Sequence, residues 1–366
     1  MRKLTAAYNK FGINLLRQLA EEFSDTNVLF SPSSLGVALA MLHNGAGGPT
    51  QQAIAEVLCL GGIDEQEFNE SNSLLLSTFE KPEPQVQLMM PIAVWMDRDF
   101  SFSPTFLQLI RNVFKADFAS VDFKDPRTLN LINGWAHEKT NGKVEALIND
   151  ADLSSMTGGI LTNAVYFKGL WLAPFDQRKT QTGVFYLGSG KQKNVLLMTQ
   201  SITCPYLETD AFEAVCLQYS DRFSMYIFVP DENSSLSVFL RNLNEVNLED
   251  WLTEFDDSRL ELSLPRFQIK GEYDLKNTLG HLGMEVAFTP KADFTPMGLA
   301  QHFISKVVHK AVIEVNEEGT EAAAATAVML VRSLPMEVVI NRPFFFMIRD
   351  TKHDMTLFTG VVADPD

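Results

Sequence analysis

The sequence predicts one mixed α+β domain, and three observations support this. Residues 4–23 place apolar side chains at every third or fourth position, which is the period of an amphipathic helix. Residues 160–167 form a strongly strand-favouring run. Helix-like and strand-like segments continue to the end, and no internal repeat, Pro/Ser-rich linker or low-complexity block separates them. Although 366 residues would allow two domains, this organisation predicts a single domain, residues 1–366.

The chain opens with predicted helices. The apolar stripe of the first helix consists of Leu4, Tyr8, Phe11, Leu15, Leu19 and Phe23. Ser31 is typical of an N-cap and Pro32 of a first helical position, so we expect a second helix from there to about His43. Its side chains are apolar on most faces, which predicts a buried helix. The glycine-rich residues 45–48 then form a turn, and Thr50 can cap the next helix.

The rest of the chain mixes both kinds of element. We expect helices at residues 129–147 and 273–284, and strands within residues 160–167, 204–230, 260–267, 307–315, 338–340 and 357–362.

Charge limits the partners of this protein. The net charge is −16, and the sequence has no block of Lys or Arg. We therefore expect a solvated acidic surface, with no binding of nucleic acid or of an anionic membrane through a basic patch. No run of about 18 apolar residues is present, so the sequence predicts no membrane span.

The cysteines and the N-terminus bear on the compartment. Cys59, Cys204 and Cys216 are too few, and odd in number, for a disulfide framework, so we expect packed thiols. The first three residues resemble the start of a signal peptide, but Asn9 and Lys10 interrupt the apolar stretch that should follow. We expect a cytoplasmic protein, or a secreted form from which the signal is already absent.

Enzyme motifs are missing from the sequence. It has no Gly-x-Ser-x-Gly, His-Glu-x-x-His or Cys-x-x-Cys pattern, and its six histidines show no metal-ligand spacing. We therefore predict a protein that is not an enzyme, with no cofactor and no bound metal.

An unusual tract lies near the C-terminus. Residues 317–327 are mostly small or acidic, and Arg332 is the only Lys or Arg between Lys310 and Arg342. Gly319 gives the backbone freedom to turn. The tract is typical of a segment presented to a protease as a substrate. It consists of small residues able to form a β-strand, followed by one cation that a protease could recognise.

The side chains of the tract separate into two faces if it is extended. One face consists of small or β-branched residues: Thr320, Ala322, Ala324, Thr326 and Val328. Glu321 lies on the other face. A dense sheet interior would accept the first face and reject a charged or bulky one. The tract also suits a short helix, because Ala has the highest helix propensity; an exposed loop can be helical before it is attacked, so the two interpretations are compatible.

The order of several motifs resembles one family, the serpins. These are protease inhibitors that trap their targets by inserting the cut loop into a sheet. The resemblance is carried by residues 27–35, 163–175, 309–327 and 341–346, with support from residues 264–267 and 292–294. It implies a serpin-like α+β domain with a large central β-sheet, two further sheets, about eight or nine helices and an exposed reactive loop at about residues 317–341.

The resemblance also assigns residues. The hinge of the loop corresponds to Glu317, Glu318, Gly319, Thr320, Glu321, Ala322, Ala323, Ala324 and Ala325. The shutter of the family, beneath the opening point of the main sheet, corresponds to Ser31, Ser34, Asn163 and His309. Trp171 falls at the breach, where the loop first enters. The alternatives are a core histidine with satisfied hydrogen bonds for His309 and simple packing for Trp171.

The reactive bond is assigned by chemistry and by length. A trypsin-like specificity pocket holds an acid, so the sequence favours cleavage between Arg332 and Ser333. The usual family spacing, counted from Glu317, places the bond after Ser333 instead, so Ser333-Leu334 remains the alternative.

These assignments imply a function. We expect a monomeric suicide-substrate inhibitor of serine endopeptidases, with trypsin-like enzymes favoured as partners. The alternative is a non-inhibitory serpin that acts as a carrier, chaperone or storage protein; such relatives tend to have a charged or bulky inward hinge residue, which this tract lacks. Residues 64–79, the counterpart of the basic helix of heparin-binding members, contain four acids and no Lys or Arg, so heparin is not expected to bind.

Overall fold

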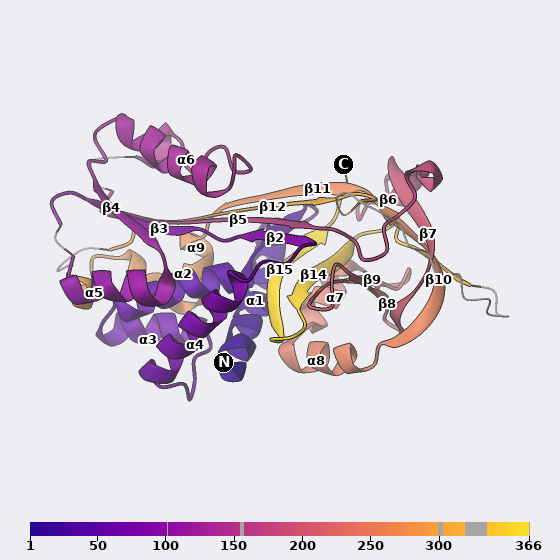
Figure 1. Cartoon of the computed structure of the whole chain (residues 1–366), viewed down its shortest axis with the longest axis horizontal. Coiled ribbons are helices and arrows are strands. Elements are labelled where there is room, and N and C mark those ends of the chain that lie inside the picture. The colour runs from indigo at the N-terminus through magenta and orange to yellow at the C-terminus, as the bar shows by residue number, and fades with distance from the viewer. Residues whose placement is uncertain (101, 154–156, 299–302, 319–334, 366) are drawn as a thin grey trace.

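The computed structural model describes residues 1–365 except residues 101, 154–156, 299–302 and 319–334. Its helices and sheets form the α+β architecture that the sequence predicts (Figure 1). The α-helices of the described part are α1 (Arg2–Glu22), α2 (Pro32–Asn44), α3 (Gly48–Val57), α4 (Glu65–Phe79), α5 (Pro104–Leu109), α6 (Arg127–Lys139), α7 (Leu236–Asn242), α8 (Glu245–Thr253) and α9 (Lys276–Leu279). None of them is long and apolar enough to cross a membrane.

The strands of the described part form two sheets. The six-stranded sheet consists of β11 (Phe267–Asp274), β12 (Lys306–Val315), β5 (Gly159–Gly169), β3 (Ile92–Asp97) and β4 (Asp117–Val121) in that order, with β2 (Val86–Met89) beside β5. The nine-stranded sheet consists of β1 (Val28–Phe30), β15 (Met355–Val362), β14 (Phe344–Asp350), β9 (Phe223–Pro230), β8 (Phe212–Gln218), β7 (Gln192–Glu208), β10 (Asp256–Pro265) and β13 (Met336–Val339), with β6 (Gln181–Tyr186) beside β7.

One strand explains why the two further sheets expected from the resemblance appear as one. Strand β7 is 17 residues long. It pairs with β6 along its first part, with β10 from Leu197 to Tyr206, and with β8 at its end. The two smaller sheets are therefore joined through this single long strand.

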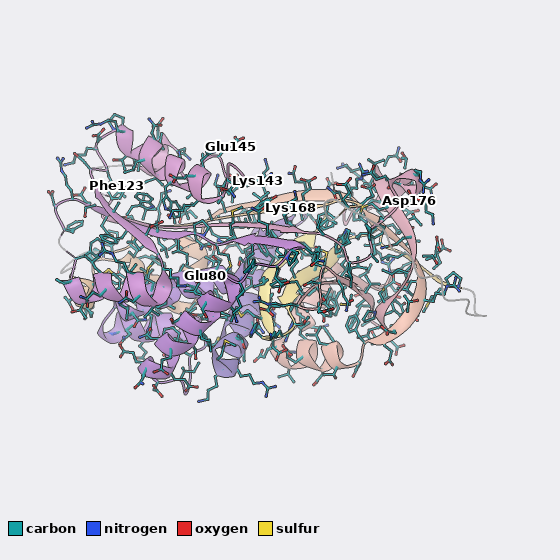
Figure 2. All side chains as sticks on the ribbon, viewed as in Figure 1. Glu80, Phe123, Lys143, Glu145, Lys168 and Asp176 are labelled. Atoms are coloured by element: carbon teal, nitrogen blue, oxygen red, sulfur yellow. The ribbon has the colours of Figure 1, made fainter. Side chains whose placement is uncertain are left out.

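Helices cover both faces of the six-stranded sheet. Helix α6 packs on one face, where Ile132 and Ala136 contact a cluster that includes Trp95 and Val308 (Figure 1). Helix α2 lies on the opposite side, with every residue from Pro32 to Leu42 buried. Figure 2 shows the loop after α6 reaching back over the sheet, where the Lys143 ammonium lies 5.4 Å from the ring centroid of Tyr166.

The boundary between β5 and β12 positions the site, and we call it the seam. The two strands are parallel neighbours, paired from Lys306 with Ile160 to Ile313 with Phe167. Each also pairs antiparallel on its other side, β12 with β11 and β5 with β3. Because β5 and β12 run in the same direction, the seam has a carboxyl end, beside Gly169 and Val315, and an amino end, beside Gly159 and Lys306.

Three predicted helix boundaries are wrong. The helix expected at residues 129–147 ends at Lys139, because Asn141 and Gly142 adopt positive φ and turn the chain. The helix expected from residue 273 begins at Lys276, since β11 continues to Asp274. Thr50 does not cap α3 but lies inside it, where its hydroxyl accepts a hydrogen bond from the Asp293 amide at 2.9 Å.

Candidate functional site

A closed set of hydrogen bonds crosses the middle of the seam. His309 on β12 and Asn163 on β5 are direct partners in the strand register, and His309 Nδ1 lies 2.6 Å from Asn163 Oδ1. The Asn163 amide donates to Ser34 Oγ at 2.6 Å, and the Ser34 backbone amide donates to Ser31 Oγ at 3.3 Å. The Ser31 amide in turn donates to His309 Nε2 at 3.1 Å. We call these four residues the seam cluster.

The seam cluster is buried and uncharged. His309 and Asn163 are both fully inaccessible to solvent. Nε2 of His309 accepts the Ser31 amide, so the proton of a neutral ring lies on Nδ1 and is donated to Asn163. Burial lowers the pKa of His309 to about 3, which keeps the ring neutral at ordinary pH. All four side chains therefore have hydrogen-bond partners, and the pair formed by Asn163 and His309 crosses the seam.

Trp171 lies at the carboxyl end of the seam. Its indole Nε1 donates to the backbone carbonyl of Asn316 at 2.8 Å. Its ring stacks on Tyr219 with centroids 4.4 Å apart and planes 10° apart. The side chain is buried. Trp171 thus connects the end of β5 to the residue that precedes the tract.

Glu317, the first tract residue, is held in a buried ion pair. Its carboxylate oxygen Oε1 accepts hydrogen bonds from Arg266 Nε at 2.7 Å and from the Thr180 hydroxyl, and it lies 2.5 Å from Arg266 Nη2 in an ion pair. Its backbone carbonyl accepts from the Phe175 amide at 2.9 Å. Burial acts to raise the pKa of Glu317, but the hydrogen bonds from Arg266 and Thr180 outweigh it, so the pKa lies below its usual value.

A groove of about 420 Å³ opens beside this ion pair. It is lined by the end of β12, the start of β11 and Gln177, whose amide donates to Glu318 at 2.8 Å. The described part of the tract therefore begins in an open groove at the carboxyl end of the seam.

The structure groups most of the residues that the resemblance selected. Ser31, Ser34, Asn163 and His309 lie together, and Trp171 lies beside Asn316, next to the hinge. Glu317 and Glu318 are described, whereas the rest of the hinge, residues 319–325, and the candidate reactive-bond residues Arg332, Ser333 and Leu334 lie outside the described residues.

Sequence reasoning missed the partners of Glu317. Arg266 belongs to residues 264–267, which supported the family resemblance, but no role was expected for it. Thr180 gave no signal. A lone arginine directly after a Leu-Pro strand end could have indicated a nearby acid, but not which one.

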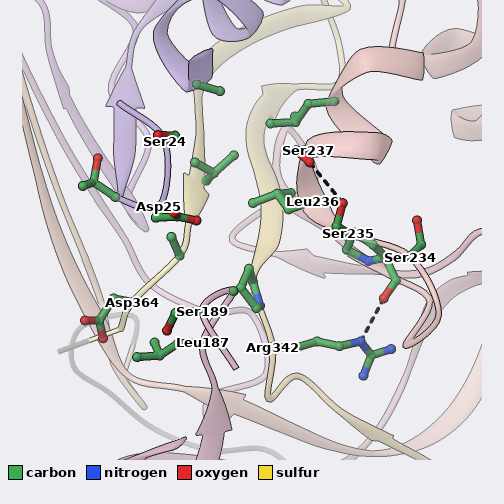
Figure 3. A pocket seen from close by; sticks show the side chains of 18 of the residues that line it. Ser24, Asp25, Leu187, Ser189, Ser234, Ser235, Leu236, Ser237, Arg342 and Asp364 are labelled. Atoms are coloured by element: carbon green, nitrogen blue, oxygen red, sulfur yellow. Dashed lines mark hydrogen bonds between the residues drawn. The ribbon is translucent and has the colours of Figure 1, made fainter. Parts of the chain in front are cut away.

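A second cavity lies away from the seam. It has a volume of about 1150 Å³ and lies between the end of α1, the start of α7 and the turn after β6 (Figure 3). Its lining includes five carboxylates and three arginines, and Arg342 donates to the Pro230 carbonyl at 2.8 Å. Small-ligand sites usually place only a few polar groups in a mainly apolar lining, so this cavity is not typical of a carrier site.

The described residues offer no metal centre. No group of three or more His, Cys, Asp or Glu side chains among them could hold an ion. The three cysteines are free thiols. Burial raises the pKa of Cys204 to about 12 and of Cys216 to about 11, so neither is a nucleophile at ordinary pH.

Comparisons with known proteins agree on a family. The model of the family Serpin (serine protease inhibitor) matches residues 6–365. Serpin B6 of Macaca fascicularis is 34% identical, and leukocyte elastase inhibitor of Bos taurus is 33% identical; each alignment covers 100% of both chains. Human thyroxine-binding globulin in complex with thyroxine superposes with a TM-score of 0.91 at 29% identity, covering 99% of this chain and 98% of that one. The thermophilic serpin tengpin in its native state gives 0.89 at 29%, covering 99% and 94%.

Proposed function

The chain belongs to the serpin family, and from this premise we propose that it is a suicide-substrate inhibitor of serine endopeptidases with trypsin-like specificity. The observation that carries the proposal is the position of the tract relative to the seam. Strand β12 ends at Val315, and the tract begins two residues later at the carboxyl end of the seam. A chain that turns back there would run antiparallel to both β5 and β12, which now pair only with each other at this boundary.

The free energy gained by insertion is large. A strand added between β5 and β12 would form about a dozen new ladder hydrogen bonds, each contributing about 0.5–1.5 kcal/mol, or on the order of 10 kcal/mol in total. An ordinary domain has a total stability of about 5–15 kcal/mol. Serpins are metastable proteins that change conformation in this way, so the uninserted state is held kinetically.

The proposed mechanism uses the chemistry of the protease. The protease serine attacks the carbonyl of the bait bond, and the peptide nitrogen leaves as a new N-terminus. The resulting ester is the ordinary acyl-enzyme. The freed tract then enters the seam, carries the attached protease across the molecule and distorts its active site before water can hydrolyse the ester. The inhibitor contributes no catalytic group.

The specificity rests on Arg332. A trypsin-like pocket holds a carboxylate that binds a cation, and Arg332 is the only Lys or Arg between Lys310 and Arg342. We propose the bond between Arg332 and Ser333 as the reactive bond, in preference to Ser333-Leu334.

One experiment tests both the mechanism and the bond. The protein is mixed with trypsin, the products are separated in SDS, and the released C-terminal fragment is weighed. We expect an SDS-stable adduct and a fragment that begins at Ser333. If the fragment begins at Leu334, and elastase rather than trypsin is inhibited, the reactive bond is Ser333-Leu334. Cleavage without an adduct and without a rise in melting temperature would favour the carrier, chaperone or storage alternative.

A further inference from the structure

A partly buried ion-pair cluster lies at the amino end of the seam. Lys306 is the first residue of β12. Its ammonium nitrogen lies 2.5 Å from Asp152 Oδ1 and 3.4 Å from Asp274 Oδ2. The Lys306 side chain is 25% exposed and that of Asp152 is 17% exposed, so the closer pair is well shielded from water. Shielding makes such a pair stronger than an ion pair on the open surface.

The two acids lie on different sides of the seam. Asp274 ends β11, which pairs with β12 on the side away from β5. Asp152 ends the short turn at residues 150–152, which leads into β5. The other oxygen of Asp152 accepts the Asn149 amide at 2.8 Å, which fixes the carboxylate within that turn. The contact of Lys306 with Asp152 therefore crosses the seam, whereas its contact with Asp274 does not.

Backbone contacts at the same place reinforce the crossing. The Ser305 amide donates to the Gly159 carbonyl at 2.9 Å, and the Ser305 hydroxyl accepts from the Gly158 amide at 3.0 Å. Burial acts to lower the pKa of Lys306, but its two carboxylate partners raise it on balance. The ammonium is therefore charged throughout the neutral range, and the ion pair is intact there.

The position of Lys306 along β12 determines at which stage of insertion its ion pair with Asp152 would break. Lys306 lies eleven positions before Glu317 on a continuous strand and its extension. A chain that turns at the hinge and returns antiparallel would reach the level of Lys306 after about eleven further residues plus the turn, just short of Arg332. The amino end of the seam would thus be the last part to open.

We propose that the Lys306–Asp152 ion pair holds the amino end of the seam closed, and that it must break in the last stage of insertion. This inference rests on the proposed function. It assigns Lys306 and Asp152 the role of slowing spontaneous insertion of the uncut loop, which would otherwise consume the inhibitor before it meets a protease.

The test compares three changes of one acid to its amide. Asp152→Asn removes the partner that crosses the seam, and Asp274→Asn removes the other partner of the same ammonium. Glu272→Gln removes the partner of Lys310, 2.8 Å away and also confined to β11 and β12. Each variant is incubated warm without protease, and its remaining capacity to inhibit trypsin is followed over time. We expect Asp152→Asn to shorten the active half-life about tenfold, which corresponds to about 1.4 kcal/mol of barrier, and the two controls to change it less than twofold.

Two further readouts separate the possible failures. The inactivated Asp152→Asn protein should show a raised melting temperature, since insertion gains stability whereas unfolding does not. Amide hydrogen exchange at residues 306–308 should be faster in Asp152→Asn than in either control, and this measurement needs no protease. If exchange and half-life are the same in all three variants, the assignment is wrong. If exchange changes but the wild-type protein forms no adduct with trypsin, the contact is real and the proposed function is what has failed.

Discussion

The middle and the carboxyl end of the seam are both polar, but they use different kinds of group. The seam cluster contains only neutral groups and is completely buried, with His309 and Asn163 at 0% exposure. At the carboxyl end, Glu317 is ionised and its side chain is 2% exposed, while its partner Arg266 keeps 37% of its side chain in contact with solvent. The buried charge of Glu317 at this end is therefore paired with a group that reaches water.

This contrast shows where a sheet that opens can tolerate charge. An unpaired charge in the interior costs several kcal/mol, whereas a neutral hydrogen bond that is exchanged for another costs little. The middle of the seam can therefore part only by exchanging neutral partners. The carboxyl end can open first, because the ion pair of Glu317 with Arg266 joins the end of β12 to the start of β11, on the side away from β5, and need not break.

The largest expected effect concerns the residue that would enter the seam first. Thr320 lies outside the described residues, and the sequence places it at the start of the inward face of the tract. Thr320→Arg would bury an unpaired charge during insertion. A barrier raised by about 3 kcal/mol slows insertion roughly a hundredfold, so hydrolysis of the acyl-enzyme would win. We expect the variant to be cut by trypsin and to release active enzyme.

The matched control for this change is Glu321→Arg, on the outward face. The measurement is the number of inhibitor molecules consumed for each trypsin molecule inactivated. That number should rise steeply for Thr320→Arg and little for Glu321→Arg. Equal values for the two variants would contradict the two-face interpretation of the tract.

The largest effect on stability is expected at the ion pair of Glu317 with Arg266. Glu317→Lys would place an ammonium against Arg266 in a buried position and leave the Thr180 hydroxyl without its acceptor. We expect the free energy of unfolding to fall by about 3–5 kcal/mol, measured by urea denaturation. Glu314→Lys is the control, because Glu314 is exposed on β12, three positions before Glu317. Similar urea midpoints for the two variants would show that the ion pair does not stabilise the carboxyl end.

Much of this comparison could be predicted from the sequence. The periodic apolar positions correctly predicted α1, the Ser-Pro cap correctly predicted the start of α2, and the residue 307–315 run correctly predicted β12. Each of these elements is specified by residues close to one another in the sequence. The residues of the seam cluster were selected through the family resemblance, and in the structure they lie together.

The sequence did not predict the contacts between residues that are far apart along the chain. Arg266 and Glu317 are 51 positions apart, and Lys306 and Asp152 are 154 apart. No local pattern states which of many acids a given cation will meet. The parallel pairing of β5 with β12 also joins segments more than 140 residues apart, so the seam itself could be inferred only from the family. The early end of α6 followed from a turn at Asn141 and Gly142 that local composition left ambiguous.

A smaller effect is the pH dependence of the free energy of unfolding, which differs between the seam cluster and the carboxyl end. The pKa of His309 is lowered from 6.5 to about 3 in the fold, so below pH 6.5 the unfolded chain binds the proton that the folded ring excludes. Its contribution to stability is full above pH 6.5 and is lost as the pH falls towards 3, at up to about 1.4 kcal/mol for each pH unit. The lowered pKa of Glu317 has its effect only below the ordinary value of 4.5. Between pH 7 and pH 5 we therefore expect a loss of about 2 kcal/mol from the seam cluster alone.

The measurement is the free energy of unfolding at pH 7 and pH 5 in a His43→Gln background, because burial also lowers the pKa of His43. Adding His309→Gln should flatten the dependence. A slope that survives this second change would place the titrating group elsewhere and remove the argument that the seam cluster must stay neutral.

The smallest effect distinguishes packing at Trp171 from its hydrogen bond to the hinge. Trp171→Phe keeps an aromatic ring against Tyr219 but removes the bond to the Asn316 carbonyl, at a cost of about 1 kcal/mol. Trp95→Phe is the control, since it removes an equally short indole bond, 2.8 Å to the Thr162 hydroxyl, from a buried site away from the hinge. Both variants should lose a similar amount of stability in urea. Only Trp171→Phe should speed amide exchange at residues 315–318, because only that bond ties β5 to the start of the tract. Equal exchange in the two variants would reduce Trp171 to a packing residue and leave the contacts of Glu317 with the Phe175 amide and the Thr180 hydroxyl to hold the carboxyl end closed.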